Sequence, residues 1–113
     1  MKKFQLGEFE EIALLAIAIL HKSAYGVAVK EEIEAQLDRE VSMGALHASL
    51  LRLEDKGYIK SSKGESTEER AGRPRNYYEI TATGKKAITY ARESREKMWN
   101  AIPKVVFEFS RGF

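Results

Sequence analysis

Apolar residues recur at helical spacing through the first half of the chain, and one stretch has the clearest pattern. Between residues 42 and 57 they fall three or four positions apart on one narrow stripe: Met43, Leu46, Leu50 and Leu53. Ser42 belongs to the residue types that cap helix N-termini, and Gly57 stands where a left-handed residue commonly ends a helix. The pattern predicts a short capped helix that packs through this stripe.

Two further helices are predicted ahead of it. Residues 12–20 form an unbroken apolar run, and the acidic residues just before them suit the positive end of a helix dipole. Because the run is apolar on every side, we expect a central, nearly fully buried helix. Residues 23–37 predict an amphipathic helix, since apolar residues step by four along one face and charged residues occupy the other.

The pattern changes after Gly57. Residues 58–63 and 76–81 are short segments rich in aromatic and β-branched residues, and a polar stretch with Gly and Pro separates them. This arrangement predicts a β-hairpin with a long loop. Thr81 then suits the cap of a long helix that ends near Ile102, before a proline.

Three helices, a hairpin and a long helix follow one another in the order of a winged helix-turn-helix. In that fold the third helix enters the major groove of DNA and the hairpin contacts the adjacent backbone or minor groove. We predict a mainly α (α+β) fold, with a winged-helix DNA-binding domain at residues 1–82 and a C-terminal dimerisation helix with an apolar tail at residues 83–113. So long a last helix exceeds what a small core can cover, and its apolar face is expected to meet a partner.

The composition is that of a globular domain, with 43% hydrophobic and 32% charged residues in 113. The chain has no cysteine, which excludes a disulfide framework and a thiolate metal site. No signal peptide is evident, and the apolar run of residues 12–20 is shorter than the roughly 20 residues that span a bilayer. A cytoplasmic protein without membrane attachment is expected.

The net charge of +2 is unevenly distributed. Residues 1–69 hold 9 Lys and Arg against 13 Asp and Glu, a net of −4, whereas residues 70–113 hold 10 against 4, a net of +6. A polyanion such as DNA would therefore be met by the second half, although solvated surface charge is an alternative interpretation.

The face of the 42–57 helix opposite the apolar stripe carries small and lightly polar residues. Entry into the major groove needs such a face, because short side chains permit close approach and polar ones bond base edges or phosphates. Candidate DNA contacts on this helix and at the start of the preceding one are Tyr25, Ser42, Ala45, His47, Ala48, Ser49 and Arg52. Tyr25 could equally serve packing, and His47 could equally be a half-buried residue at the helix tip.

Basic residues gather in the predicted hairpin, and we expect them to contact DNA as well: Lys63, Arg70, Arg73 and Arg75. The segment Gly72-Arg73-Pro74-Arg75 resembles the core of AT-hook motifs, in which Pro holds the chain extended and Arg enters a narrow minor groove. The match is partial, because Ala71 stands where such a motif usually has another Arg. It supports only a basic tip of the wing.

The long helix is predicted to form a dimer interface through residues at helical spacing: Ile88, Ala91, Met98, Trp99 and Ile102.

In combination these motifs resemble PadR-like transcriptional regulators, in order and spacing, over roughly residues 5–100. The segments that carry the resemblance are Leu6-Gly7-Glu8, Ala24-Tyr25-Gly26, Gly44-Ala45-Leu46-His47, Arg52-Leu53-Glu54, Lys56-Gly57, Gly72-Arg73-Pro74-Arg75-Asn76-Tyr77-Tyr78 and Thr81-Ala82-Thr83-Gly84. The resemblance implies a homodimeric winged-helix repressor that binds a dyad-symmetric operator. Because an aromatic residue of the dimer interface stacks planar ligands in some members, the resemblance also makes Met98 and Trp99 candidates for binding a small planar hydrophobic effector. Packing within the interface is the simpler interpretation of Trp99. His47 departs from the family, which usually has Tyr at that place.

We therefore predict a DNA-binding transcriptional regulator, a ligand-responsive homodimeric repressor. Its expected partners are double-stranded DNA, a second copy of the chain and a small planar hydrophobic effector. The alternative is a winged-helix protein-interaction module without sequence-specific DNA binding. No enzyme activity, cofactor or metal site is predicted, because the two histidines lie far apart and no carboxylate pair is set against a nucleophile.

Overall fold

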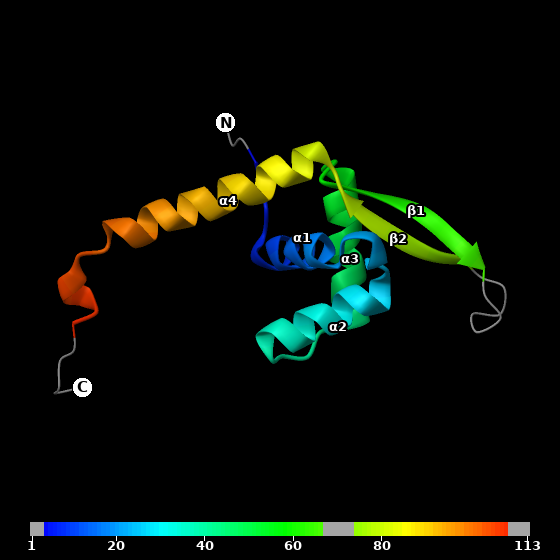
Figure 1. The fold of residues 1–113 in the computed structure, drawn as a ribbon, viewed down its shortest axis with the longest axis horizontal. Coiled ribbons are helices and arrows are strands. Elements are labelled where there is room, and N and C mark those ends of the chain that lie inside the picture. Colours follow the sequence, from blue (N-terminus) through cyan, green and yellow to red (C-terminus); the bar gives the residue numbers. More distant parts are fainter. Residues whose placement is uncertain (1–3, 67–73, 109–113) are drawn as a thin grey trace.

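A computed structural model describes residues 4–66 and 74–108, which form a winged helix with a projecting arm (Figure 1). The elements in chain order are the helices α1 (Glu8–Leu20), α2 (Gly26–Leu37) and α3 (Met43–Asp55), the strands β1 (Ile59–Ser66) and β2 (Pro74–Ile80), and the helix α4 (Ala82–Ala101). Short 3-10 turns, η1 (His21–Ser23) and η3 (Lys104–Val106), follow α1 and α4. The mainly helical winged-helix prediction is confirmed.

The predicted caps of α3 and α4 are present. Ser42 Oγ accepts a hydrogen bond from the Ala45 amide at 3.0 Å, and Thr81 Oγ1 accepts one from the Gly84 amide at 3.0 Å. Gly57 adopts a φ of +79°, the left-handed conformation that glycine permits at the end of α3. Local sequence thus fixes where both helices begin and where α3 ends.

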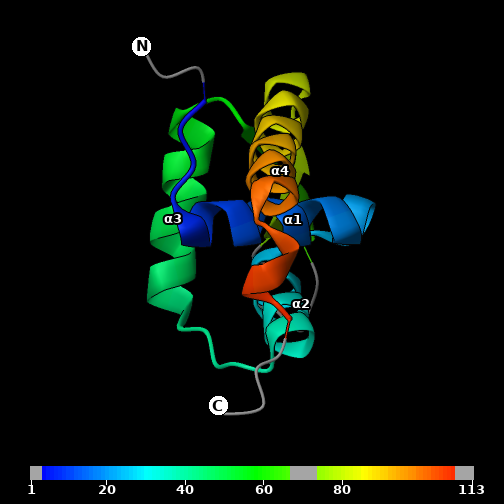
Figure 2. The same ribbon diagram turned by 90° about the vertical axis from the view of Figure 1, so that its left-hand side faces the viewer.

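The core lies where α1 packs against α2 and α3, and α3 runs crosswise to α1 (Figure 2). Its fully buried large side chains come from all three helices: Leu14, Ile17, Val29, Ile33, Leu46 and Leu53. Met43, predicted to belong to the same apolar stripe, is 42% exposed, because the first turn of α3 extends past the core toward α2.

The prediction that α1 is nearly fully buried is wrong. Leu15 and Ile19 are 43% and 56% exposed, because α2 and α3 cover only the face that carries Ala13, Leu14 and Ile17. The second helix also begins three residues later than predicted. Residues 21–23 form η1, and Tyr25 makes a β-bridge with Tyr77.

The hairpin is tied to the body at its base. Its antiparallel register pairs Ile59 with Ile80, and the Tyr78 amide donates to the carbonyl of Ala24 at 2.8 Å. This hydrogen bond and the isolated bridge between Tyr25 and Tyr77 hold the wing next to the start of α2.

The helix α4 starts against the body and then leaves it (Figure 1). Gly84 is buried there, and a Cβ at that position would overlap the backbone carbonyl of Tyr58, so the close approach requires glycine. Beyond Arg95 the helix is exposed up to Ala101. None of the helices built from the described residues combines the length and apolar character needed to cross a membrane.

Candidate nucleic-acid interface

The exposed face of α3 is small and uncharged over its first turns. Gly44, Ala45, His47 and Leu51 are exposed and Ala48 is half-buried. No Lys, Arg, Asp or Glu occurs between residues 43 and 51. Such a face can approach base edges closely, as the sequence predicted. Leu51, 54% exposed, lies on this face although the sequence reasoning did not single it out. Helical spacing places it between Ala48 and Asp55 and could have identified it.

Ser49 lies on the buried side of α3, contrary to its predicted place on the face that meets DNA. It is only 1% exposed, and its Oγ accepts a hydrogen bond from Arg52 Nη2 at 3.0 Å. At helical spacing Ser49 falls beside Leu46 and Leu53 rather than opposite them. It supports Arg52 from within the fold.

Arg52 belongs to an ion cluster that joins α3 to the start of α1. Its Nε donates to Glu10 Oε2 at 2.8 Å, while Lys56 Nζ donates to Glu10 Oε1 at 2.5 Å and the Gly7 amide donates to the same oxygen at 3.1 Å. Burial raises the pKa of Glu10, but the hydrogen bonds from Lys56, Arg52 and Gly7 outweigh it, and the pKa is lowered overall. The cluster anchors the second half of α3 to α1, so Arg52 has a structural partner in addition to any role toward DNA.

Three predicted DNA contacts from separate parts of the chain form a cluster where the first residues of β2 lie beside the start of α2. The Arg75 guanidinium carbon lies 4.1 Å from the centroid of the Tyr25 ring, and Tyr77 meets that ring edge-on at 5.7 Å. Tyr25, His47 and Arg75 line the same cavity of about 170 Å³, between the start of α2, the start of α3 and strand β2. The fold thus brings an aromatic ring, an imidazole and a guanidinium together beside two helix N-termini.

Arg75, which lines this cavity, has a hydrogen-bond donor left unused by the described residues. Its Nε is buried and has no hydrogen-bond partner among the described residues. A buried donor without a partner is costly, so such a group is expected to meet an acceptor when a ligand is bound. The adjacent start of α2 carries free backbone amides, and Tyr25 makes no side-chain cap bond there. A phosphate suits both features.

The other predicted contacts are placed as follows. Lys63 is exposed on β1 and pairs in register with Asn76, which is one of the residues that line the cavity. Ser42 is exposed, but its hydroxyl is occupied by the cap of α3. Arg70 and Arg73 lie outside the described residues.

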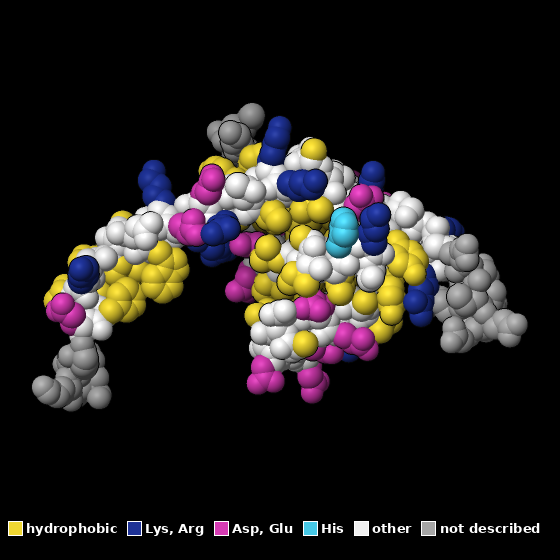
Figure 3. Space-filling model, viewed as in Figure 1, with side chains coloured by type: hydrophobic (Ala, Val, Ile, Leu, Met, Phe, Trp, Pro, Cys, Tyr) yellow, Lys and Arg dark blue, Asp and Glu magenta, His cyan; other side chains and the backbone are white. Residues whose placement is uncertain are grey.

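The residues predicted to form a dimer interface divide into two groups. Ile88 packs against the core of its own chain, and Ala91 and Ile102 are half-buried. Met98 and Trp99, in contrast, are 74% and 62% exposed near the end of α4. Figure 3 shows apolar side chains gathered at this end of the arm, where Trp99 stacks on Phe107 with ring centroids 5.7 Å apart. Exposed apolar surface of this kind is typical of an interaction site.

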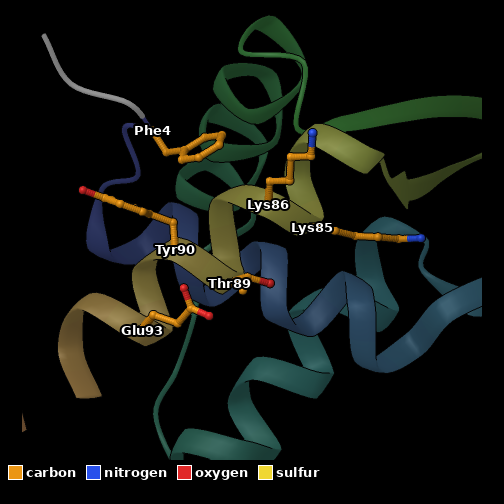
Figure 4. Close-up of a pocket in the computed structure, with 6 residues that line it drawn as sticks. All are labelled: Phe4, Lys85, Lys86, Thr89, Tyr90 and Glu93. Atoms are coloured by element: carbon orange, nitrogen blue, oxygen red, sulfur yellow. The ribbon is translucent and has the colours of Figure 1, made fainter. Parts of the chain in front are cut away.

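A larger open cavity, of about 540 Å³, lies beside the first half of α4 (Figure 4). Its lining comprises Phe4, Lys85, Lys86, Thr89, Tyr90 and Glu93. Phe4 and Tyr90 contact each other there, with ring centroids 5.6 Å apart. Neither Met98 nor Trp99 lines this cavity, so the residues predicted to bind an effector do not belong to it.

Comparison with known proteins decides the family. The sequence profile of the transcriptional regulator PadR-like family matches residues 14–90. The chain belongs to this family. Relatedness to a Clostridium thermocellum transcriptional regulator is also evident, at 30% identity over 90% of this chain and 92% of that chain, with a TM-score of 0.67. Among curated proteins none matches significantly.

Two further solved structures are similar to this PadR-like regulator. A PadR-like transcription factor from Bacteroides fragilis is 26% identical over 81% of this chain and 84% of that chain, with a TM-score of 0.68. A complex structure of RosR from H. salinarum is 26% identical over 88% of this chain and 79% of that chain, with a TM-score of 0.69. Family and neighbours are transcriptional regulators, and the matched residues include α2, α3 and the hairpin but not the outer half of α4.

Proposed function

We propose that this PadR-like regulator is a homodimeric repressor that binds a dyad-symmetric promoter site, with α3 in the major groove and the hairpin against the adjacent backbone. The observation that carries the proposal is the cluster of Tyr25, His47 and Arg75, where Arg75 is stacked on Tyr25 and its buried Nε has no hydrogen-bond partner among the described residues. This group lies directly beside the uncharged first turns of α3. A regulator of this kind acts in the cytoplasm, where it meets promoter DNA.

Each element has a defined part in DNA binding. Ala45 and Leu51 offer apolar contact to thymine methyl groups, and His47 offers a hydrogen bond to a base edge or phosphate. Arg75 and the free amides at the start of α2 bind a backbone phosphate, which positions α3. Lys63, with Arg70 and Arg73 farther along the loop, adds charge along the backbone or minor groove.

Dimerisation is supported by two exposed apolar surfaces on one chain. The first is the end of the arm, formed by Met98, Trp99 and residues 105–107. The second is an open cavity of about 220 Å³ between α1 and α2, whose apolar lining includes Leu15, Ile19 and Leu37. Because the arm points away from its own body, its apolar end is free to meet a second copy. Residues 1–82 then read DNA and residues 83–113 join the subunits.

Oligomeric state tests the arm directly. In sedimentation experiments the full chain is expected to behave as a dimer, and Trp99→Glu as a monomer, because a carboxylate would be placed in the apolar contact. Lys97→Glu changes an exposed residue on the other side of α4 and serves as the control. A Trp99→Glu protein that stays as dimeric as Lys97→Glu would contradict the role of the arm.

Selection from a library of randomised duplexes tests DNA binding. The full chain is expected to enrich an inverted repeat, since two-fold symmetric dimers bind two-fold symmetric sites. Enrichment of no sequence would favour the protein-interaction module instead.

Ligand response is proposed through Trp99, and the fluorescence of Trp99 is expected to change with planar hydrophobic compounds that weaken DNA binding. Unchanged fluorescence across such a panel would contradict a sensor at Trp99.

A further inference from the structure

The point where α4 leaves the body sets the direction of the arm. Its first turns are fixed by buried Gly84 and Ala87, and Ala91 is half-buried one turn later. After that the described contacts between α4 and the body end in one ion pair, in which Arg95 Nη2 donates to Glu11 Oε1 at 2.8 Å. The arm from residue 96 to residue 101 is exposed. The ion pair is therefore the outermost of the described contacts that hold the helix at its angle.

This contact differs from the other ion pair of α4. The Glu11 side chain is only 15% exposed, so its carboxylate is held in place by the surrounding fold. The neighbouring Glu8 adds negative charge, and Glu11 followed by Glu8 raises the pKa of Arg95. Arg92 and Glu96, 3.0 Å apart, pair only within α4 and leave the angle of the helix unaffected. Among the described residues, the ion pair of Arg95 with Glu11 connects this stretch of the arm to α1.

Adjacent residues of α1 hold the two functional elements. Glu10 binds Arg52 and Lys56 of the α3 end, while Glu11 binds Arg95 of the arm. The first turn of α1 thereby fixes the orientation of α4 relative to α3 through side chains on consecutive residues. In a dimer joined by the arms, this orientation decides how far apart the two copies of α3 stand.

We propose that the Arg95–Glu11 ion pair makes the regulator selective for the spacing between the two half-sites of its DNA site. The inference rests on the proposed homodimeric DNA binding. Arg95 acts as a positioning residue: it contacts no base, and it holds the arm so that both reading helices match one distance along the duplex.

The length of the arm converts a small movement at Arg95 into a movement at Trp99 comparable to the rise of one base pair. At 1.5 Å per residue, Arg95 lies roughly 6 Å along the helix from half-buried Ala91, and Trp99 lies roughly 12 Å from it. A sideways shift of about 2 Å at Arg95, with Ala91 as pivot, therefore moves Trp99 by about 4 Å. The rise of one base pair is about 3.4 Å. Loss of the ion pair permits movements of the size that separates one half-site spacing from the next.

The test uses the duplex selected by the wild-type chain, rebuilt as a series in which the distance between its half-sites changes by one base pair at a time. The affinity of the wild type is expected to fall about tenfold one base pair from the best spacing, which corresponds to about 1.4 kcal/mol. For Arg95→Gln, the affinity one base pair from the best spacing is expected to fall less than about threefold, because its arm is held less firmly. The Arg95 side chain is 62% exposed, so solvent screens its charge and this variant should stay folded.

Three further variants are measured on the same series of duplexes. Glu11→Gln should give the same broadened profile, and the Glu11→Gln/Arg95→Gln double variant should be no broader than either single variant. Arg92→Gln removes the same charge from α4 without touching α1 and should keep the wild-type profile. A wild-type profile in Arg95→Gln overturns the inference while leaving DNA binding intact. A wild type indifferent to spacing overturns the proposed dimeric recognition and this inference with it.

Discussion

The ion cluster around Glu10 makes a specific prediction about stability. Glu10→Gln keeps the shape of the side chain and removes its charge, while Arg52 and Lys56 remain beside it. The carboxylate accepts three hydrogen bonds, two of them from charged donors, and its side chain is 8% exposed. Bonds to charged groups contribute about 1.5–3 kcal/mol each, but the Arg52 side chain is 55% exposed and solvent screens its share. We expect the free energy of unfolding to fall by about 2 kcal/mol at pH 7.

The same substitution predicts a pH dependence with a definite sign. The pKa of Glu10 is lowered in the folded chain, so its contribution is fully present above the ordinary value of 4.5. It is lost as the pH falls through the folded-state pKa, because the protonated carboxyl then resembles glutamine. Urea unfolding of the wild type and Glu10→Gln, at matched protein concentration, should therefore differ at pH 7 and converge in acid.

Glu31→Gln is the control for this experiment, since Glu31 is an exposed carboxylate on α2. Its effect should stay within about 0.5 kcal/mol at every pH. Equal stability of Glu10→Gln and the wild type at pH 7 would refute the structural role of the cluster. A difference that persists unchanged in strong acid would refute its electrostatic origin.

Three further predictions concern packing, capping and the wing. Gly84→Ala should lower stability by about 2–3 kcal/mol, since the new Cβ meets the Tyr58 carbonyl. The control Gly44→Ala, whose Cβ has nothing within 4 Å, should be neutral or stabilising by up to about 1 kcal/mol. Equal melting temperatures of the two variants would contradict the close approach at Gly84. Ser42→Ala should cost about 1 kcal/mol in urea unfolding through loss of the α3 cap, and an unchanged midpoint would show that the cap contributes nothing. Tyr25→Leu should weaken DNA binding about threefold to tenfold in an anisotropy titration, because it releases Arg75. Tyr25→Phe keeps the ring and should keep the affinity. Equal affinities of the two variants would contradict a role for the stacking of Arg75 on Tyr25.

Much of the fold could be predicted from short-range signals. The cap of α3 at Ser42 and the glycine that ends this helix depend on residues a few positions apart, and both are present. The predicted apolar stripe is buried at Leu46, Leu50 and Leu53 but not at Met43. The burial of α1 could not be predicted in the same way. Its composition is apolar all round, but how much of it is covered depends on where α2 and α3 pack, and they leave Leu15 and Ile19 exposed.

The candidate site shows the same division. Residue types alone placed Tyr25, His47 and Arg75 among the DNA contacts, but their meeting in one cavity depends on the wing docking beside the start of α2. Helical spacing sets Arg52 opposite the apolar stripe and Ser49 on its flank, and their polarity favours a role toward DNA. In the structure Arg52 donates hydrogen bonds to Ser49 and to Glu10, which lies 42 positions before it. A contact at that separation leaves no periodic signal in the sequence.

The most direct test of duplex recognition through α3 and the cluster of Tyr25, His47 and Arg75 is the salt dependence of DNA affinity. It is measured by fluorescence anisotropy with the selected duplex and with a scrambled duplex of equal length. For the wild type, the logarithm of the affinity should fall linearly with the logarithm of salt concentration, and the selected duplex should bind at least about a thousandfold tighter than the scrambled one. Arg75→Gln should reduce the slope by about 1, for one lost phosphate contact. Equal affinity for both duplexes, or an Arg75→Gln slope identical to that of the wild type, would contradict recognition through this surface.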